Sequence, residues 1–328
     1  MCTAISLLTQ HGETFFGRTM DFSYDIQPQI YIVPNNNIWI NTLNMKQFCD
    51  YYSFIGIGQE LDGILGFFDG VNEKGFAAAA LYFAGYAQYD DQLSYPTTQP
   101  VASFDFLHYI LGRCVSIKDL KQLLESISII GMPDPVTKTI APLHWIATDR
   151  SGECVVIEQT QKGLELFCNP IGVMSNSPDF QWHMTNLRNY METSPEQTEE
   201  VSWGNTRLTP FGQAGGTIPL PGGYTSPERF VRTAYLKTHI PTPKNSMEAI
   251  ISCFHVMESV SIPRGAVISN RNTYDYTKYT AFINTNTCEY FFKTYDNLQI
   301  ESASLFKNHN PFMQPISLGK LNRPIIFD

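Results

Sequence analysis

The residues at the very start of the chain could together perform thiol chemistry. Cys2 directly follows Met1, so loss of that one methionine would leave a thiol and a free α-amino group on the same Cα. An amine in this position can serve as the base for its own thiol, and the reference pKa of an α-amine, about 7.7–8.0, is close to neutrality. A cysteine at position 2 is incidental in most chains, so this interpretation depends on the residues that follow.

A cation and a carboxylate follow at fixed spacing in the run Gly-Arg-Thr-Met-Asp-Phe at 17–22. Arg18 close to the sulfur would favour the thiolate over the thiol, and Asp21 could hold and orient the terminal ammonium. The alternative is a surface ion pair. Apolar residues surround both charges, however, and buried charges need partners. A hairpin of Cys2–Leu8 with Thr14–Phe22 would bring Cys2 to face this segment.

The elements that must position these residues alternate between strands and helices along the chain. Patterns of apolar and turn residues predict strands at Cys2–Leu8, Thr14–Phe22, Gln29–Val33, Ile38–Ile40, Ser53–Ile57, Ile64–Phe68, Phe76–Phe83, Leu143–Thr148, Cys154–Thr160, Tyr279–Asn284 and Glu289–Tyr295. The cluster at 69–75 is predicted to be a turn. No composition break divides the chain, so we expect a single domain over residues 1–328 in which sheets and helices form layers.

Helices are predicted from capping residues and from apolar residues at helical spacing. The expected caps are Ser103, Ser116, Ser226 and either Asn245 or Ser246, and a further helix is expected around Trp182–Met191. Residues 193–225 contain many Pro, Gly and Ser residues and little periodicity. This segment is predicted to be a long loop or a protruding arm.

The amino-acid composition limits the class of protein and the kinds of partner that are possible. The 328 residues are 43% hydrophobic and 16% charged, which indicates a globular chain with a large core. The net charge of −9 and the lack of any basic run argue against a nucleic-acid partner. The seven cysteines form no CxxC and the seven histidines no HExxH, so neither a disulfide framework nor a metal site is expected.

The location of the protein is predicted from what the sequence lacks. It has no basic segment followed by an apolar stretch at its start, so no signal peptide is expected. No apolar run approaches about 18 residues, so no membrane partner is expected either. A reducing, cytoplasmic location follows, and it suits a free working thiol.

Four motifs, in this order, resemble the choloylglycine hydrolase family, which contains bile salt hydrolases and penicillin V acylases among the N-terminal-nucleophile hydrolases. They are Met-Cys-Thr at 1–3, Gly-Arg-Thr-Met-Asp-Phe at 17–22, Asn-Ser-Pro at 176–178 and Arg-Phe-Val-Arg at 229–232. Shorter fragments at 69–75 (Asp-Gly-Val-Asn-Glu-Lys-Gly), 142–146 (Pro-Leu-His-Trp-Ile) and 212–216 (Gly-Gln-Ala-Gly-Gly) look similar to the family as well. The resemblance implies an α+β fold, a four-layer αββα sandwich of two antiparallel sheets between helical layers. It implies no cofactor and no metal.

The resemblance also implies roles for the charged residues. Cys2 matches the family's nucleophile, which self-processing would expose by removing Met1. Arg18 and Asp21 match the residues beside that nucleophile. Arg229 matches an arginine that supports the charge network of the active site.

Oxyanion donors, substrate contacts and assembly are implied in the same way. Asn176 matches a side-chain donor to the oxyanion, and Tyr82 matches the position whose backbone N–H is the second donor. Met20 and Tyr24, together with Tyr82, are candidate substrate-binding residues, although ordinary core positions would explain Met20 and Tyr24 equally well. The segment 193–225 matches a region used for assembly, so a homotetramer is expected.

The substrate implied by the resemblance is a small-molecule N-acyl amide. Bile salt hydrolases tend to carry Asn where this chain has Tyr82, and penicillin V acylases tend to carry Tyr. The sequence therefore predicts hydrolysis of penicillin V to 6-aminopenicillanic acid and phenoxyacetate. The alternatives are deconjugation of glycine or taurine bile salts and acylase activity on N-acyl homoserine lactones. A papain-like thiol hydrolase, whose local signature is absent, and a non-catalytic protein with an aromatic-lined binding site are competing classes.

Overall fold

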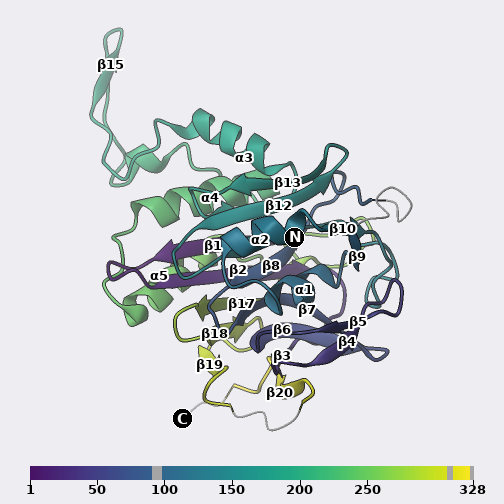
Figure 1. Ribbon diagram of the computed structural model, residues 1–328. Helices are drawn as coiled ribbons and strands as arrows, with labels where there is room; N and C mark the ends of the chain where they lie inside the picture. Colours follow the sequence, from purple (N-terminus) through teal and green to yellow (C-terminus); the bar gives the residue numbers. More distant parts are fainter. Residues whose placement is uncertain (91–97, 309–312, 326–328) are drawn as a thin grey trace.

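Two antiparallel sheets packed face to face form the centre of the protein (Figure 1). The computed structural model describes residues 1–90, 98–308 and 313–325. One sheet has the strand order β14-β1-β2-β17-β18-β19. Its members are β1 (Cys2–Leu8), β2 (Thr14–Phe22), β14 (Val173–Met174), β17 (Tyr276–Asn284), β18 (Glu289–Thr294) and β19 (Glu301–Ser304).

The second sheet has the strand order β13-β12-β11-β8-β7-β6-β3-β20. Its members are β3 (Gln29–Val33), β6 (Phe54–Leu61), β7 (Ile64–Asn72), β8 (Ala77–Tyr82), β11 (Leu143–Thr148), β12 (Cys154–Thr160), β13 (Gly163–Cys168) and β20 (Ile316–Lys320). Three small two-stranded pairs are β4 (Ile38–Ile40) with β5 (Gln47–Cys49), β9 (Gln99–Ala102) with β10 (Ile127–Ile130), and β15 (Val201–Trp203) with β16 (Thr206–Leu208).

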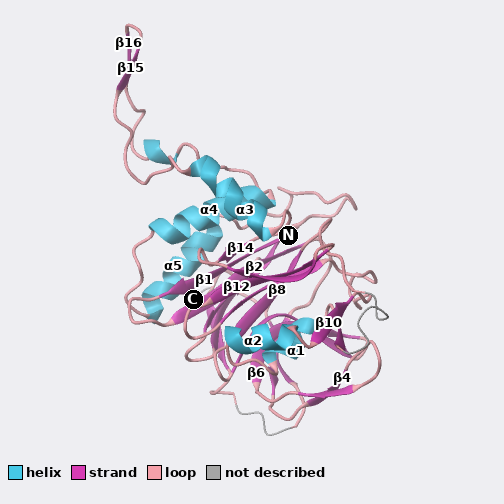
Figure 2. Cartoon of the chain, turned by 45° about the horizontal axis from the view of Figure 1, so that its top comes forward, coloured by secondary structure: helices cyan, strands magenta, loops and turns pink. Residues whose placement is uncertain are grey.

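Helices cover the outer faces of both sheets (Figure 2). The α-helices are α1 (Phe106–Leu111), α2 (Ile117–Leu124), α3 (Phe180–Asn186), α4 (Ser226–His239) and α5 (Ser246–Glu258), and short 3₁₀ turns cover Leu187–Tyr190 and Gly215–Thr217. Helix α1 packs against β7 and β8 of the larger sheet, while α4 and α5 pack against β1 and β2 of the smaller one. The predicted four-layer sandwich of the α+β class is confirmed.

The alanine-rich segment of β8 shows how the sequence specifies these layers. Ala77 and Ala79 belong to the apolar cluster between the two sheets, whereas Ala78 packs in the cluster beneath α1. This alternation is the period-2 pattern of a strand buried on both faces. Because β7 and β11 both pair with it, the segment forms the predicted strand despite the helix propensity of alanine.

Some predicted boundaries were wrong. The cluster at 69–75 is not wholly a turn, since β7 continues to Asn72 and pairs Asp69 with Ala79 of β8. Helix α1 begins at Phe106 after Asp105 instead of at Ser103. Both boundaries depend on contacts with other elements of the fold, which a local sequence pattern does not show.

Two further helix starts also differ from the prediction. Thr225, not Ser226, is the N-cap residue of α4, and the carboxylate of Glu228 accepts a hydrogen bond from the Thr225 N–H at 3.2 Å. Helix α3 begins at Phe180 after Asp179, whose side chain accepts a bond from the backbone two residues into the helix. The caps predicted at Ser116 and Asn245 are both present.

The segment 193–225 leaves the body of the protein as an arm that ends in the β15–β16 hairpin (Figure 1). Trp203 near its tip is 75% exposed, and Phe211 and Ile218 are exposed as well. Of the two forms that the sequence left open for this segment, the structure has the protruding arm. Within the described ranges of the chain, no helix is both long and apolar enough to cross a membrane.

Candidate active site

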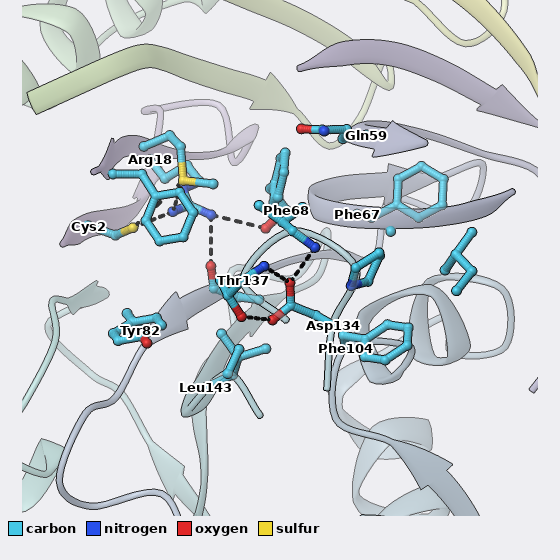
Figure 3. Close-up of a pocket in the computed structure, with 18 residues that line it drawn as sticks. Cys2, Arg18, Gln59, Phe67, Phe68, Tyr82, Phe104, Asp134, Thr137 and Leu143 are labelled. Carbon is cyan, nitrogen blue, oxygen red and sulfur yellow. Dashed lines mark hydrogen bonds between the residues drawn. The ribbon is translucent and has the colours of Figure 1, made fainter. Parts of the chain in front are cut away.

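The pairing of β1 with β2 brings Cys2 and Arg18 together. In this antiparallel hairpin Cys2 lies opposite Met20, and Ala4 lies opposite Arg18. Nη2 of Arg18 donates a hydrogen bond to Sγ of Cys2 at 2.6 Å, and both side chains are buried (Figure 3). The sequence therefore places a fixed cation directly on the thiol sulfur.

A gap in the larger sheet receives the rest of the Arg18 side chain. Strands β7 and β8 pair only from Asp69 to Val71, so the carbonyl groups beyond this point are free to accept other donors. Nη1 of Arg18 donates to the carbonyl oxygens of Phe68 at 3.1 Å and Ala80 at 2.7 Å. Arg18 thus extends from β2 of one sheet into an opening of the other.

A buried carboxylate lies near this guanidinium. Asp69 accepts hydrogen bonds from the hydroxyl groups of Tyr279 at 2.6 Å and Tyr290 at 2.7 Å. Burial alone would lower the pKa of Arg18, but Cys2, Tyr279 and Asp69 outweigh it and raise that pKa. Burial raises the pKa of Asp69, and the positive charge of Arg18 opposes the rise. The sequence analysis did not identify Asp69 as a site residue, although an aspartate directly after an apolar run was the available signal.

Asn176 joins this group from a distant part of the chain, because the short strand β14 pairs with β1. Its Oδ1 accepts bonds from the backbone nitrogen of Cys2 and from Nη2 of Arg229, each at 2.7 Å. Its Nδ2 donates to the carbonyl oxygen of Tyr82 at 2.7 Å. An amide nitrogen carries two hydrogens, so one remains available to another acceptor.

Arg229, in the first turn of α4, fixes the backbone of the first residues. Its Nη1 donates to the carbonyl oxygen of Cys2 at 2.6 Å and to the hydroxyl of Thr3. The same nitrogen lies 3.7 Å from Oδ2 of Asp21, and both side chains are fully buried. Burial lowers the pKa of Arg229, and Asp21 opposes this effect.

Asp21 lies near the N-terminus, but its carboxylate is bonded to other groups. The ammonium group of Met1 donates to the main-chain oxygen of Asp21 at 2.6 Å and lies 3.5 Å from Oδ2 of Asp275. The Asp21 carboxylate accepts from the hydroxyl groups of Thr19 and Thr277 at 3.1 and 2.6 Å. With Met1 in place, Asp275 is the carboxylate next to the terminal amine, and the sequence analysis missed it.

The backbone N–H of Tyr82 points to the edge of β8 that faces Asn176. Hydrogen bonds alternate along an antiparallel ladder, and the N–H of Phe83 donates to Pro142 at 2.7 Å on the β11 side. The N–H of Tyr82 therefore points to the opposite edge of β8, where its own carbonyl accepts from Asn176. Among the described residues, no hydrogen bond from this N–H is seen.

An apolar pocket opens directly at Cys2 and Arg18 (Figure 3). Its walls are formed by Cys2, Arg18, Met20, Phe22, Gln59, Ile64, Gly66, Phe67, Phe68, Ala80, Tyr82, Phe104, Asp134, Pro135, Val136, Thr137, Ala141 and Leu143. Met20 and Tyr82 are therefore pocket residues. Tyr24 is not part of the wall, and its ring packs against that of Phe22 at a tilt of 35°, with 5.0 Å between centroids. The sequence analysis missed the loop from Asp134 to Thr137, because nothing in its local pattern suggested a cavity.

The remaining cysteines differ from Cys2 in their surroundings. All seven thiols are free. Burial raises the pKa of Cys114 and of Cys154 to about 12, so both stay protonated at neutral pH. Within the described part of the chain, no group of three His, Cys, Asp or Glu side chains is placed to hold a metal ion.

Comparison with known proteins shows the family. A model of linear amide C-N hydrolases, choloylglycine hydrolase family, matches residues 2–317. The chain belongs to the choloylglycine hydrolase family. This member is therefore a linear amide hydrolase, as predicted.

Three relatives illustrate the range of the family. A bile salt hydrolase/transferase from Clostridium perfringens is 34% identical over 311 residues, which cover 94% of each chain. The structure of variant R18L of the conjugated bile acid hydrolase from Clostridium perfringens has a TM-score of 0.90 at 30% identity, covering 100% of this chain and 99% of that one. A penicillin V acylase from Pectobacterium atrosepticum is 24% identical over 320 residues, which cover 89% of this chain and 78% of the relative.

The contact between Arg18 and the sulfur predicts how the thiol reacts. Arg18→Met keeps a long side chain but removes the charge, so we expect alkylation of Cys2 by iodoacetamide at pH 7 to slow by about 10-fold or more. The measurement is peptide mass spectrometry of Cys2 over time. Arg232→Met is the matched control, because Arg232 also donates to main-chain carbonyls but does not contact Cys2. An unchanged alkylation rate in Arg18→Met would contradict this assignment.

The buried histidine beside Asn176 predicts part of the acid sensitivity of the fold. Burial lowers the pKa of His183 from 6.5 to about 4, so unfolded chains take up its proton at a higher pH than folded ones. The free energy of unfolding therefore falls as pH drops from about 6.5 to 4, by up to about 3 kcal/mol from this residue. Denaturant titrations across this range should show that His183→Gln lacks this share of the loss. The exposed His239→Gln should keep the wild-type slope, and equal slopes for all three proteins would refute the assignment.

Proposed function

We propose that this linear amide hydrolase cleaves conjugated bile salts, releasing glycine or taurine from the steroid acid. The observation that carries the choice is the 34% identity to a bile salt hydrolase/transferase across 94% of both chains, against 24% to a penicillin V acylase. The pocket agrees with this choice. Its walls are mostly apolar, as an apolar acyl group requires.

Penicillin V is the second candidate, and Tyr82 is the observation that favours it. The side chain of Tyr82 stands in the pocket wall. The contribution of Tyr82 to the chemistry, however, comes from its backbone N–H and carbonyl, which an asparagine would present equally. The identity of this side chain therefore bears on the shape of the acyl pocket and not on the reaction. N-acyl homoserine lactones, which also carry an apolar acyl group on an amide, are a third substrate class.

In the proposed reaction the thiolate of Cys2 attacks the amide carbonyl, forming a carbon–sulfur bond. The developing oxyanion accepts bonds from the second Nδ2 hydrogen of Asn176 and from the Tyr82 N–H. The carbon–nitrogen bond then breaks as the α-ammonium of Cys2, formed when the amine took the thiol proton before the attack, protonates the leaving amine. A water molecule, deprotonated by the same amine, hydrolyses the thioester and restores the thiol.

Removal of Met1 is a required step in this scheme. Met1 occupies the space beside the Cys2 nitrogen, where its carbonyl accepts from the Asp21 N–H at 3.0 Å. In the processed enzyme the free amine of Cys2 keeps Asn176 Oδ1 as its acceptor, at the position where the amide nitrogen now lies 2.7 Å away. Asp21 and Asp275 lie close to this end of the chain.

Assembly is a separate part of the proposal. The exposed aromatic and apolar side chains of the arm, among them Trp203, Phe211 and Ile218, support a role of residues 193–225 in forming a homotetramer. Each chain then acts as one N-terminal-nucleophile hydrolase domain over residues 1–328.

Replacement of the nucleophile tests the reaction. Cys2→Ser supplies a hydroxyl that is far less acidic than the thiol, so we expect kcat to fall by about 10³-fold or more. The exposed thiol variant Cys168→Ser is the control and should keep the wild-type rate. Intact mass spectrometry of the active wild-type protein should show loss of one methionine. Near-wild-type turnover by Cys2→Ser, or an active enzyme that retains Met1, would disprove the scheme.

A substrate panel tests the specificity. Glycocholate, taurocholate, penicillin V and an N-acyl homoserine lactone are assayed by release of the amine product, or of phenoxyacetate for penicillin V. We expect kcat/KM for a conjugated bile salt to exceed that for penicillin V by about 10-fold or more, because the larger apolar acid covers more of the pocket wall. The Cys2→Ser protein gives the background rate. A higher kcat/KM for penicillin V would reverse the assignment.

A further inference from the structure

Two buried histidines contact successive carbonyl groups of the loop that carries Asn176. Nε2 of His144, in β11, lies 2.9 Å from the carbonyl oxygen of Ser175. Nε2 of His183, in α3, lies 2.8 Å from the carbonyl oxygen of Asn176 itself. A carbonyl oxygen only accepts, so each imidazole must donate from Nε2. The two rings are 1% and 2% exposed, which protects both bonds from water.

Neighbouring residues fix the orientation of the His144 ring. Its Nδ1 lies 3.2 Å from Oε1 of Glu158, and the ring stacks on Phe83 with centroids 4.2 Å apart and an angle of 8°. Glu158 is itself buried and accepts from the N–H of Phe180 at 3.0 Å. The ring can therefore neither rotate nor move away from Ser175. This residue lies in the Pro-Leu-His-Trp-Ile motif at 142–146, to which the proposed reaction gives no role.

The His183 ring is held in a different way. It stacks on Phe230 with centroids 4.6 Å apart, and its Nδ1 is buried without a hydrogen-bond partner among the described residues. A neutral imidazole with its hydrogen on Nε2 fits these surroundings, and the lowered pKa of His183 keeps it neutral. The N–H of Asn176 adds a third backbone contact by donating to the hydroxyl of Ser226 at 2.9 Å.

We propose that His144 and His183 are positioning residues, which hold the backbone of Ser175 and Asn176 so that the Asn176 amide is aimed at the oxyanion. The inference rests on the proposed function, in which that amide is a donor. Hydrogen bonds with residues of β11, α3 and α4 hold the backbone on both sides of the Asn176 Cα. Its side chain is in turn limited to the position between Cys2, Arg229 and Tyr82. A hydrogen-bond donor that is held in place before the reaction stabilises the transition state more than it strengthens substrate binding.

Paired amide variants separate positioning from simple packing. The amide nitrogen of glutamine reaches the position of Nε2, whereas that of asparagine stops near Nδ1. We therefore expect His183→Gln to keep kcat within about 3-fold, and His183→Asn to lower kcat by about 10-fold or more with little change in KM. The same contrast is expected for His144→Gln and His144→Asn. Equal kcat values for the Gln and Asn variants at both positions would overturn the proposal.

His108 provides the matched control for loss of a buried histidine. It is 4% exposed, its Nε2 lies 3.0 Å from Oδ2 of Asp50, and it lies beneath the other face of the larger sheet, away from Cys2. His108→Asn should lower thermal stability but leave kcat unchanged. A drop in kcat in this variant equal to that of His183→Asn would show that any buried histidine has this effect, and would overturn the proposal.

A double-mutant cycle with Asn176→Ala is the decisive experiment. If His183 acts through Asn176, His183→Asn costs kcat in the wild type but changes it less than about 2-fold once Asn176 is alanine. Equal costs in both backgrounds would overturn the inference while leaving the proposed function intact. Full kcat in Asn176→Ala alone would instead refute the oxyanion role on which both rest. Any amide that the wild type hydrolyses serves as the substrate.

A spectroscopic measurement keeps the test valid if His183→Asn does not fold. In protein labelled with ¹⁵N-histidine, the ring signal that disappears in His183→Gln should belong to a neutral imidazole with a slowly exchanging Nε2–H. Assignment of the hydrogen to Nδ1 would overturn the proposal.

Discussion

The hydrogen bond from the Arg18 guanidinium to the Cys2 sulfur is the interaction on which the rest of the structure depends. A buried guanidinium is stable only when its donors and its charge find partners. The open end of the β7–β8 pairing supplies two carbonyl groups, and Asp69 supplies a nearby negative charge. Arg18 thereby connects the two sheets of the sandwich at one point. The contact that helps to stabilise this buried cation also holds the thiol sulfur in the wall of an apolar pocket.

A second constraint is the position of the chain terminus. The first residues of a chain are usually poorly ordered, but β1 lies between β14 and β2 in the interior of its sheet. Arg229 and Asn176 then bond to the backbone of Cys2 on both sides of its Cα. The nitrogen and the sulfur of Cys2 therefore have one defined geometry. A nucleophile that carries its own base can work only under this condition.

Local patterns predicted much of the fold and part of the site. Strands such as Thr14–Phe22 were found at their full length, because apolar runs bounded by turn residues report pairing directly. Cys2 and Arg18 could be proposed from the sequence because a charge inside an apolar run requires a partner. Tyr82, Asn176 and Arg229 entered only through the resemblance, since nothing local marks them. The short edge elements β14 and β20 and the parallel pair β9–β10 were not predicted, because only distant partners make them strands.

The residues that the sequence did not reveal share one physical feature. Each lies in a segment with an ordinary local explanation, and only a tertiary contact marks it. Asp69 and Asp275 have partners far away in the chain, while His183 contacts Asn176 from the following helix. The side chain of Tyr82 pointed to penicillin V, whereas the likeness over the whole chain favours bile salts. One wall residue bears on the shape of one part of the pocket, whereas sequence identity is averaged over the whole chain.

The central claim is that the Arg18-bound sulfur of Cys2 forms a covalent bond with the acyl group. Rapid acid quenching during turnover, followed by peptide mass spectrometry, tests it directly. We expect the mass of the acyl group to appear on the N-terminal peptide that begins with Cys2 and to disappear as the substrate is consumed. An acyl adduct on any of the other six cysteines, or turnover with no adduct on Cys2 even when thioester hydrolysis is slowed at low pH, would contradict it.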